Sequence, residues 1–181
     1  ANDQVFDVAI DPSDPSILWA GIADASGSQP VNVMRSTDGG ATWGDRTPPH
    51  AAPLSGTAIA VDPGDSNTAI AVFGGAFGGG EAWVTTDGGD SWTDRSAGLP
   101  GNPLNAVVYD GTRLLVGGGL LFGSQFEGLY ESPDLGVTWT PLHDGTWPIL
   151  VVEDIAVDPS DAARIFVAID GGGVNRTTDG G

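Results

Sequence analysis

The sequence predicts an all-β protein, a β-propeller of four-stranded antiparallel blades, because two motifs repeat along the chain with one period. The first motif is Ser-Thr-Asp-Gly-Gly-Ala-Thr-Trp at 36–43. It returns in related form at 85–92 and 132–139, and its first five positions return at 177–181. The central aspartates of successive copies are 49, 47 and 45 residues apart. Such a period is typical of repeat architectures with several strands per unit.

The second motif is an apolar strand that ends in aspartate, Val-Ala-Ile-Asp at 8–11. It recurs at 59–62, 107–110 and 155–158, with spacings of 51, 48 and 48 residues between the aspartates. A further apolar run lies between the two motifs in every unit, at 17–22, 69–73, 114–116 and 165–169. Each unit therefore contains strand, turn, strand, loop, strand, turn and strand. Four short antiparallel strands in 45 to 50 residues is the pattern of a propeller blade.

About 3.75 blades are expected in this chain. Their predicted limits are about 5–47, 57–96, 104–142 and 153–181, and the last unit has no fourth strand. Propellers form rings of about four to eight blades, which removes exposed sheet edges. We therefore expect the remainder of a longer chain, or a second copy, to close the ring. The first residues, Ala-Asn-Asp, contain no signal peptide, as in a mature or excised fragment.

The first strand of each unit has small residues between larger ones. Ala9 lies between Val8 and Ile10, and we expect these two larger side chains to pack against a neighbouring sheet. The turn that follows is Asp-Pro-x-Asp in units one, two and four, in which proline presets φ and aspartate caps the turn amides. Unit three has the shorter sequence Asp110-Gly111-Thr112, which suits a two-residue hairpin.

The first motif predicts a structural turn between the third and fourth strands. Its aspartate is placed to accept backbone N–H groups of its own turn, its second glycine supplies a permissive φ, and its tryptophan fills the space between blades. The structural residues of the motif are Ser36, Asp38, Gly40, Trp43, Asp87, Gly89, Trp92, Asp134, Gly136, Trp139 and Asp179.

Composition limits the partners of the chain. A net charge of −18, with six arginines and no lysine, disfavours nucleic acid and anionic membranes, because phosphate binding needs clustered cations. No apolar stretch reaches the length of a membrane span, and no cysteine is present for disulfides or thiol chemistry. We expect no resident cofactor or metal. Calcium is the ion that the acidic turns would take, because it prefers oxygen ligands.

The repeated motif resembles the Asp-box, or BNR repeat, over the whole chain. This motif is found in sialidases, sortilin-type receptor domains, photosystem assembly factors and xyloglucan-cleaving glycoside hydrolases. The Ile-Asp-Pro-Ser-Asp-Pro turn combined with Arg-Ser-Thr-Asp-Gly-Gly-Ala-Thr-Trp looks most like the xyloglucanase and sortilin-like branches. The resemblance implies an Asp-box propeller that is extracellular or secreted, with the periplasm as the alternative.

The end of the blades opposite the Asp-box turns is the expected functional surface, because loops on a rigid scaffold carry most binding residues. Exposed aromatic side chains next to polar groups suit a carbohydrate, and a protein ligand is the alternative. The candidate ligand-binding residues are Phe77, Phe122, Phe126, Glu127, His143 and Trp147. The structural alternative is that Phe122 and Phe126 cover their own loop and that Trp147 packs between blades.

Catalysis by a glycosidase needs two carboxyl groups at a suitable separation. The candidate carboxyl groups outside the turn motifs are Asp24, Glu81, Glu127, Asp144 and Glu153. Asp24 resembles by location the catalytic aspartate of xyloglucanases, but the Thr-Asp-Ile-Gly-Gly pattern of that family is absent around it. The arginine cluster and Tyr–Glu pair of sialidases do not assemble either.

We therefore predict a non-catalytic binding or scaffolding part of an extracellular Asp-box propeller. The first alternative is half of a xyloglucanase-like glycoside hydrolase whose second catalytic carboxylate lies outside this chain. The second alternative is a receptor or assembly propeller that binds a peptide.

Overall fold

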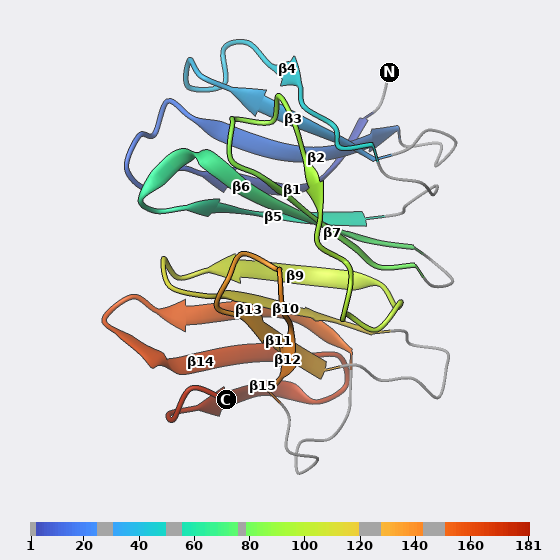
Figure 1. Cartoon of the computed structure of the whole chain (residues 1–181), viewed down its shortest axis with the longest axis vertical. Coiled ribbons are helices and arrows are strands. Elements are labelled where there is room, and N and C mark those ends of the chain that lie inside the picture. Colours follow the sequence, from blue (N-terminus) through green and yellow to red (C-terminus); the bar gives the residue numbers. More distant parts are fainter. Residues whose placement is uncertain (1–2, 25–30, 50–55, 76–78, 120–127, 143–150) are drawn as a thin grey trace.

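The computed structural model describes residues 3–24, 31–49, 56–75, 79–119, 128–142 and 151–181. These residues form four antiparallel sheets, which are stacked in chain order from the top to the bottom of Figure 1. Three sheets have four strands and the last has three, within the part of the chain that the structure describes. The predicted all-β fold of four-stranded antiparallel blades is confirmed.

Strands follow chain order across every sheet. The first sheet contains β1 (Asp3–Ile10), β2 (Leu18–Asp24), β3 (Asn32–Ser36) and β4 (Gly44–Asp45). The second contains β5 (Gly56–Asp62), β6 (Asp65–Gly74), β7 (Glu81–Thr85) and β8 (Thr93–Asp94). The third contains β9 (Leu104–Tyr109), β10 (Leu114–Gly118), β11 (Gly128–Ser132) and β12 (Thr140–Pro141). The fourth contains β13 (Val152–Asp158), β14 (Asp161–Ile169) and β15 (Gly173–Thr177).

The Asp-Pro turns and the Asp-box turns lie at the same end of the sheets. The N–H of Gly39, in the first Asp-box, donates to the carbonyl O of Ser16 at 2.9 Å. Equivalent bonds join Gly88 to Asn67 at 2.9 Å and Gly180 to Ala163 at 3.0 Å. This end of each of these three blades is therefore tied by a backbone bond between its two turns.

The first turn of the third sheet is shorter than its counterparts. The N–H of Asp110 donates to the carbonyl O of Arg113 at 3.2 Å, and Gly111 between them has a φ of 90°. A positive φ at the first central residue is typical of a two-residue hairpin loop, as the sequence predicts for this unit.

The core consists of three clusters, each between two successive sheets. Trp19 and Phe73 are fully buried between the first and second sheets. Ile70 and Leu114 are buried between the second and third. Ile165 lies in the third cluster, which the residues of the third and fourth sheets form. Burial of apolar area of this kind is the main favourable term in holding successive sheets together.

The two outermost faces of the stack differ from these interfaces. Val8 and Ile10, which we expected to pack against a neighbouring sheet, are 50% and 57% exposed. Their counterparts Ile59 and Val61 in β5 are buried against the first sheet. The expectation is wrong for the first blade because its outer side has no sheet to pack against among the described residues.

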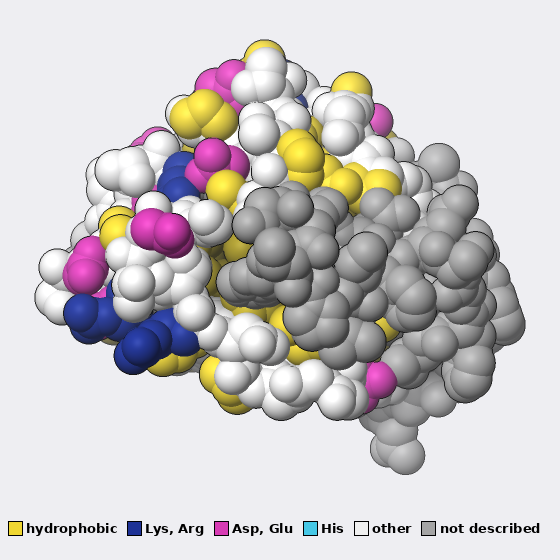
Figure 2. Space-filling view, turned by 90° about the horizontal axis from the view of Figure 1, so that it is seen from below, with side chains coloured by type: hydrophobic (Ala, Val, Ile, Leu, Met, Phe, Trp, Pro, Cys, Tyr) yellow, Lys and Arg dark blue, Asp and Glu magenta, His cyan; other side chains and the backbone are white. Residues whose placement is uncertain are grey.

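The fourth sheet is the outermost at the other end. Figure 2 views the molecule from this end, and apolar side chains are visible there beside a group of arginine side chains at the left margin. Val174 of β15 is 72% exposed. Within the described ranges, no helix is long and apolar enough to span a membrane.

Candidate functional site

The Asp-box of the first blade is a closed network of local hydrogen bonds. Ser36 is buried at the end of β3, and its Oγ donates to Asp38 Oδ1 at 2.8 Å and accepts the N–H of Gly40 at 2.9 Å. Asp38 Oδ1 also accepts the N–H of Thr42 at 2.8 Å, and Oδ2 accepts the Thr42 hydroxyl at 2.6 Å. Both carboxylate oxygens are thus used inside the turn, as expected for a side chain that replaces a backbone partner.

The second and third blades repeat this network. Asp87 accepts the N–H of Ser91 at 2.9 Å and its hydroxyl at 2.6 Å. Asp134 accepts the N–H of Thr138 at 2.8 Å and its hydroxyl at 2.7 Å. In the fourth blade the Thr177 hydroxyl donates to Asp179. The full network therefore recurs in the second and third boxes, and the fourth repeats the bond from the hydroxyl to the aspartate.

These bonds lower the pKa of the aspartates in the first three boxes. The Thr42 hydroxyl, followed by the Thr42 N–H and the Ser36 hydroxyl, lowers the pKa of Asp38 to about 2. The Ser91 hydroxyl and N–H lower the pKa of Asp87 to about 2 in the same way. A carboxylate that accepts several hydrogen bonds is stabilised in its charged form. At neutral pH these groups hold no proton and cannot act as general acids.

The second glycine is required by its backbone conformation in the three complete boxes, and in the second and third also by a close neighbour. Gly40, Gly89 and Gly136 have φ values of 88°, 87° and 80°, a region that other residues rarely adopt. A Cβ on Gly89 would also lie 2.8 Å from the Cβ of Arg46, which belongs to the preceding blade. Leu135 holds the position before Gly136 with a φ of 54°, and is the one non-glycine residue at positive φ among those described.

The tryptophans of the second and third boxes join neighbouring blades. Trp92 Nε1 donates to the carbonyl O of Arg46 at 2.8 Å, and Trp139 Nε1 donates to the carbonyl O of Arg95 at 2.8 Å. Trp43 differs from the expectation, since it is 39% exposed and its Nε1 donates within its own turn to Gly40 at 3.1 Å. No blade precedes the first one among the described residues, so Trp43 has no carbonyl of a neighbouring blade to bind.

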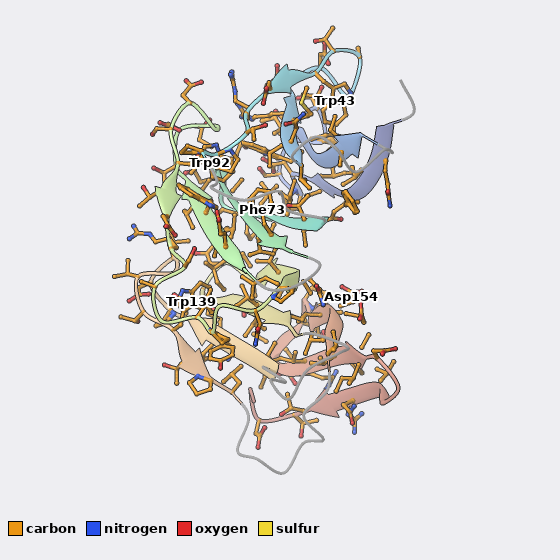
Figure 3. The ribbon with its side chains drawn as sticks, turned by 90° about the vertical axis from the view of Figure 1, so that its right-hand side faces the viewer. Trp43, Phe73, Trp92, Trp139 and Asp154 are labelled. Carbon is orange, nitrogen blue, oxygen red and sulfur yellow. The ribbon has the colours of Figure 1, made fainter. Side chains whose placement is uncertain are left out.

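Figure 3 shows how these residues are distributed. Trp92 and Trp139 lie on the left side of the view, at the outer part of the blades. Asp154 lies on the right side, at the innermost strand of the fourth sheet, and Phe73 lies between them. The tryptophan bonds therefore fix the outer part of the stack, away from the innermost strands.

A second repeated cap, which was not predicted from the sequence, follows the box tryptophan. Asp45 Oδ1 accepts the N–H and the hydroxyl of Thr47 at 2.9 and 2.6 Å, and Thr47 Oγ1 accepts the N–H of Val33 at 3.1 Å. Asp94 and Ser96 repeat it at 2.8 and 2.6 Å. The signal was the sequence Asp-Arg-Thr or Asp-Arg-Ser, two residues after the box tryptophan in units one and two. This cap places the arginine whose carbonyl binds the next tryptophan.

Comparison with known proteins gives a structural match without a sequence match. No family model matches this chain, and no curated protein matches it. An ancestral GH74 enzyme is 21% identical, with a TM-score of 0.70 over 98% of this chain and 23% of that one. The NanB sialidase from Streptococcus pneumoniae is 14% identical, with a TM-score of 0.65 over 98% of this chain and 30% of that one. YCF48 bound to D1 peptide is 14% identical, with a TM-score of 0.56 over 97% of this chain and 49% of that one.

This chain has the fold of the Asp-box propellers. The resemblance stated from the motif is thereby confirmed at the level of fold. The chain spans between about a quarter and a half of the length of these three solved chains.

The predicted ligand-binding residues of this Asp-box propeller all lie outside the described residues. They are Phe77, Phe122, Phe126, Glu127, His143 and Trp147. Asp144 lies outside them as well. Asp24 is the last residue of β2, and nothing is described of its side chain. Whether these side chains lie together therefore stays a prediction.

Two of the other carboxyl groups are described. Glu81, at the start of β7, accepts the Nε1–H of Trp83 at 2.8 Å, and Glu153 is exposed on β13. Among the residues with described positions, no group of three or more histidine or acidic side chains is arranged to hold a metal ion.

Proposed function

We propose that this chain is a non-catalytic binding or scaffolding part of an extracellular Asp-box propeller. The observation that carries the proposal is the state of the repeated aspartates, since their carboxylates accept hydrogen bonds inside their own turns and have lowered pKa values. A glycosidase needs a carboxyl group whose pKa is raised so that it can donate a proton. The repeated aspartates stabilise the blade and leave ligand contact to the opposite end.

The ligand on that opposite end is a carbohydrate or a protein segment. The strands that end there, among them β2, β6 and β10, belong to sheets held rigidly by the core clusters. The loops between them contain the aromatic and polar residues expected to bind, including Phe77 and Trp147. A rigid scaffold with aromatic loops suits stacking against sugar rings or apolar peptide side chains.

A glycan array and a peptide library, probed with the whole chain, test this proposal. Trp147→Ala is expected to remove binding of the ligand found, whereas Trp43→Ala is the matched control, since Trp43 is partly exposed at the Asp-box end. Binding that is lost in the control and kept in Trp147→Ala would contradict the proposed location. The extracellular location is tested by following secretion of the full gene product.

Part of a glycoside hydrolase is the second candidate. It is favoured by the TM-score of 0.70 with the ancestral GH74 enzyme over 98% of this chain. Incubation of the chain with xyloglucan, followed by mass spectrometry of the products, separates the two. We expect no cleavage. Cleavage that Asp24→Asn abolishes would assign the chain to the enzyme class.

A further inference from the structure

Two polar side chains of the first sheet bind the backbone of the second. At the innermost strand, Asp7 Oδ2 accepts the N–H of Ile59 at 2.8 Å, while its Oδ1 accepts the N–H of Val8 at 2.8 Å. At the third strand, the Nη2 of Arg35 donates to the carbonyl O of Ser66 at 3.2 Å. The Arg35 guanidinium also lies 5.3 Å from the ring centroid of buried Trp19, a cation–π contact.

The fourth sheet has similar residues in the same register on its outer face. In the first sheet, Asp7 pairs with Gly21 and then Val33 across the strands, and Ala9 pairs with Trp19 and then Arg35. In the fourth sheet, the corresponding pairs are Asp154 with Ala168 and Val174, and Ala156 with Phe166 and Arg176. An acid, two small residues, an aromatic ring, a valine and an arginine therefore recur at matching positions.

Local geometry supports this correspondence. Asp154 follows a break in strand register after Val152, as Asp7 follows one after Val5. The Oδ1 of Asp154 accepts the N–H of Ile155 at 2.8 Å, as Asp7 does with the residue after it. The second carboxylate oxygen of Asp154 is not used in this bond, and in the first sheet the equivalent oxygen of Asp7 binds the next blade.

The matching residues of the two sheets differ in exposure. Val33 is fully buried against the second sheet, whereas Val174 is 72% exposed. Asp154 and Arg176 are exposed on β13 and β15. Neither the second Asp154 oxygen nor the Arg176 guanidinium has a bond to another residue in the described ranges. This face therefore has the same kinds of groups with which the first sheet binds the second, and none of the described residues occupies them.

The second and third sheets lack this set. Ala58 and Ala106 hold the position of Asp7, four residues before the turn aspartate, and Val84 and Glu131 hold the position of Arg35, three residues before the box aspartate. The set is therefore a property of the first and fourth blades and does not follow from the repeat alone.

The position of the carbonyl that Arg35 binds shows which kind of turn the neighbouring blade needs. Ser66 is four residues after the first aspartate of the long Asp-Pro turn, and Ala162 holds this position in the fourth blade. Arg113 of the third blade donates to the Ala162 carbonyl at 2.9 Å, although it lies in the turn before β10 whereas Arg35 lies in β3. Both long turns that follow a described blade thus receive an arginine. The short turn of the third blade has no counterpart of this carbonyl and receives none.

We propose that the outer face of the fourth sheet is a docking surface for another Asp-box blade of the second unit's type. The occupant has a long Asp-Pro turn, whose carbonyl binds Arg176, and a free N–H at the place of Ile59, which binds Asp154. It also has a residue smaller than threonine at the place of Thr57. A Cβ on Gly21 would lie 1.9 Å from Thr57 Cγ2, and the fourth sheet has Ala168 at the place of Gly21.

A second copy of this chain fits the surface less well. Its first blade would offer a suitable turn, but its Val8 N–H already donates to Asp7. Counted back from the turn aspartate, Phe6 holds the place of Thr57, where a smaller residue is needed. The occupant is therefore a blade like the second and not the first blade of a partner copy.

The test extends the whole chain by one blade. Residues 41–96 are appended after Gly181, which completes the fourth box and adds a copy of unit two, with Thr57→Ser in the copy. Serine removes the clashing Cγ2 and keeps the hydroxyl that donates to the Val72 carbonyl at 2.9 Å. A matched chain receives residues 90–142, which add unit three with its short turn.

Hydrogen exchange and urea unfolding give the result. In the unit-two extension, the amide of the appended Ile59 is expected to be protected, and Asp154→Asn to speed its exchange about tenfold or more, as for a lost bond to a charged acceptor. Arg176→Ala is expected to lower the urea midpoint of the unit-two extension only, and to leave that of the unit-three extension and of the unextended chain unchanged. Arg164→Ala, which removes ion pairs within the fourth sheet, is the control that acts equally in all chains.

Three results would overturn the proposal. One is an unprotected Ile59 amide in the unit-two extension. Another is an equal effect of Arg176→Ala with either extension or with none. The third is self-association of the unextended chain that Arg176→Ala weakens, which would assign the surface to a second copy.

Discussion

Trp92 and Arg46 are joined across two blades, because the indole N–H of Trp92 donates to the Arg46 carbonyl at 2.8 Å. The same bond joins Trp139 to Arg95 in the next pair of blades. The Asp-box therefore acts beyond its own turn. It shapes the turn through the aspartate and connects the turn to the preceding blade through the tryptophan.

Trp92→Phe tests this connection. Phenylalanine keeps the aromatic ring and removes the donor, so we expect a loss of about 1 kcal/mol in the free energy of unfolding, the usual net value of one hydrogen bond. Trp43→Phe is the matched control, because the Trp43 bond stays within its own exposed turn. Urea unfolding of both variants measures the difference. An equal loss in the two variants would mean that the bond between blades contributes nothing.

Alanine substitutions at two box glycines separate backbone strain from crowding. Gly39 has a φ of 72°, and a Cβ added there would meet no atom within 4 Å, so Gly39→Ala is expected to cost about 1–2 kcal/mol from conformation alone. Gly89 has a φ of 87°, and a Cβ added there would lie 2.8 Å from the Arg46 side chain, so Gly89→Ala is expected to cost more. Thermal and urea unfolding measure both. A smaller cost at Gly89 would show that the arginine stem moves aside freely.

Acid is expected to weaken the fold through the box aspartates. The pKa of Asp38 and of Asp87 is about 2 in the folded chain, below the ordinary value of 3.8. A group with a lowered pKa stabilises the fold fully above its ordinary value, and this contribution is lost as the pH falls from about 4 toward 2. Urea midpoints measured between pH 6 and pH 2 should decrease mainly below about pH 4. Asp38→Asn should reduce the fall, whereas Asp170→Asn, at an exposed aspartate outside the boxes, should not.

Arg113 is expected to hold the fourth blade on the third. Its guanidinium donates to Glu131 at 2.8 Å and to the carbonyls of Gly180 and Ala162 at 3.0 and 2.9 Å. Arg113→Met should lower the local stability of β14 and β15 by about 1–3 kcal/mol, measured as faster amide exchange. Arg164→Met is the control, since its ion pairs lie within one sheet. Unchanged exchange in Arg113→Met would contradict this role.

The fold could be predicted from the sequence because its turns need particular residue types at fixed positions. Asp38 and Gly40 recur at fixed offsets, and this turn has one geometry that satisfies both a carboxylate and a positive φ. The exposure of Val8, Ile10 and Trp43 could not be read in the same way. Their residue types match their buried counterparts, and whether they are covered depends on a neighbour and not on the local sequence.

The contacts between blades could not be predicted from the sequence either. Arg113, in the turn before β10, and Arg35, in β3, bind equivalent carbonyls, so no fixed spacing relates them. The candidate ligand residues, such as Phe77 and Trp147, stay a prediction because they lie outside the described residues.

An NMR titration tests the central claim most directly, that this chain binds a ligand opposite its Asp-boxes without catalysis. The labelled whole chain is titrated with the glycan or peptide selected from the array, and the ligand is analysed by mass spectrometry afterwards. We expect shifted resonances near the strand ends at Asp24, Glu81 and Gly118, unshifted resonances at Asp38 and Asp87, and an intact ligand. Shifts confined to the Asp-box end, or a cleaved ligand, would contradict the account.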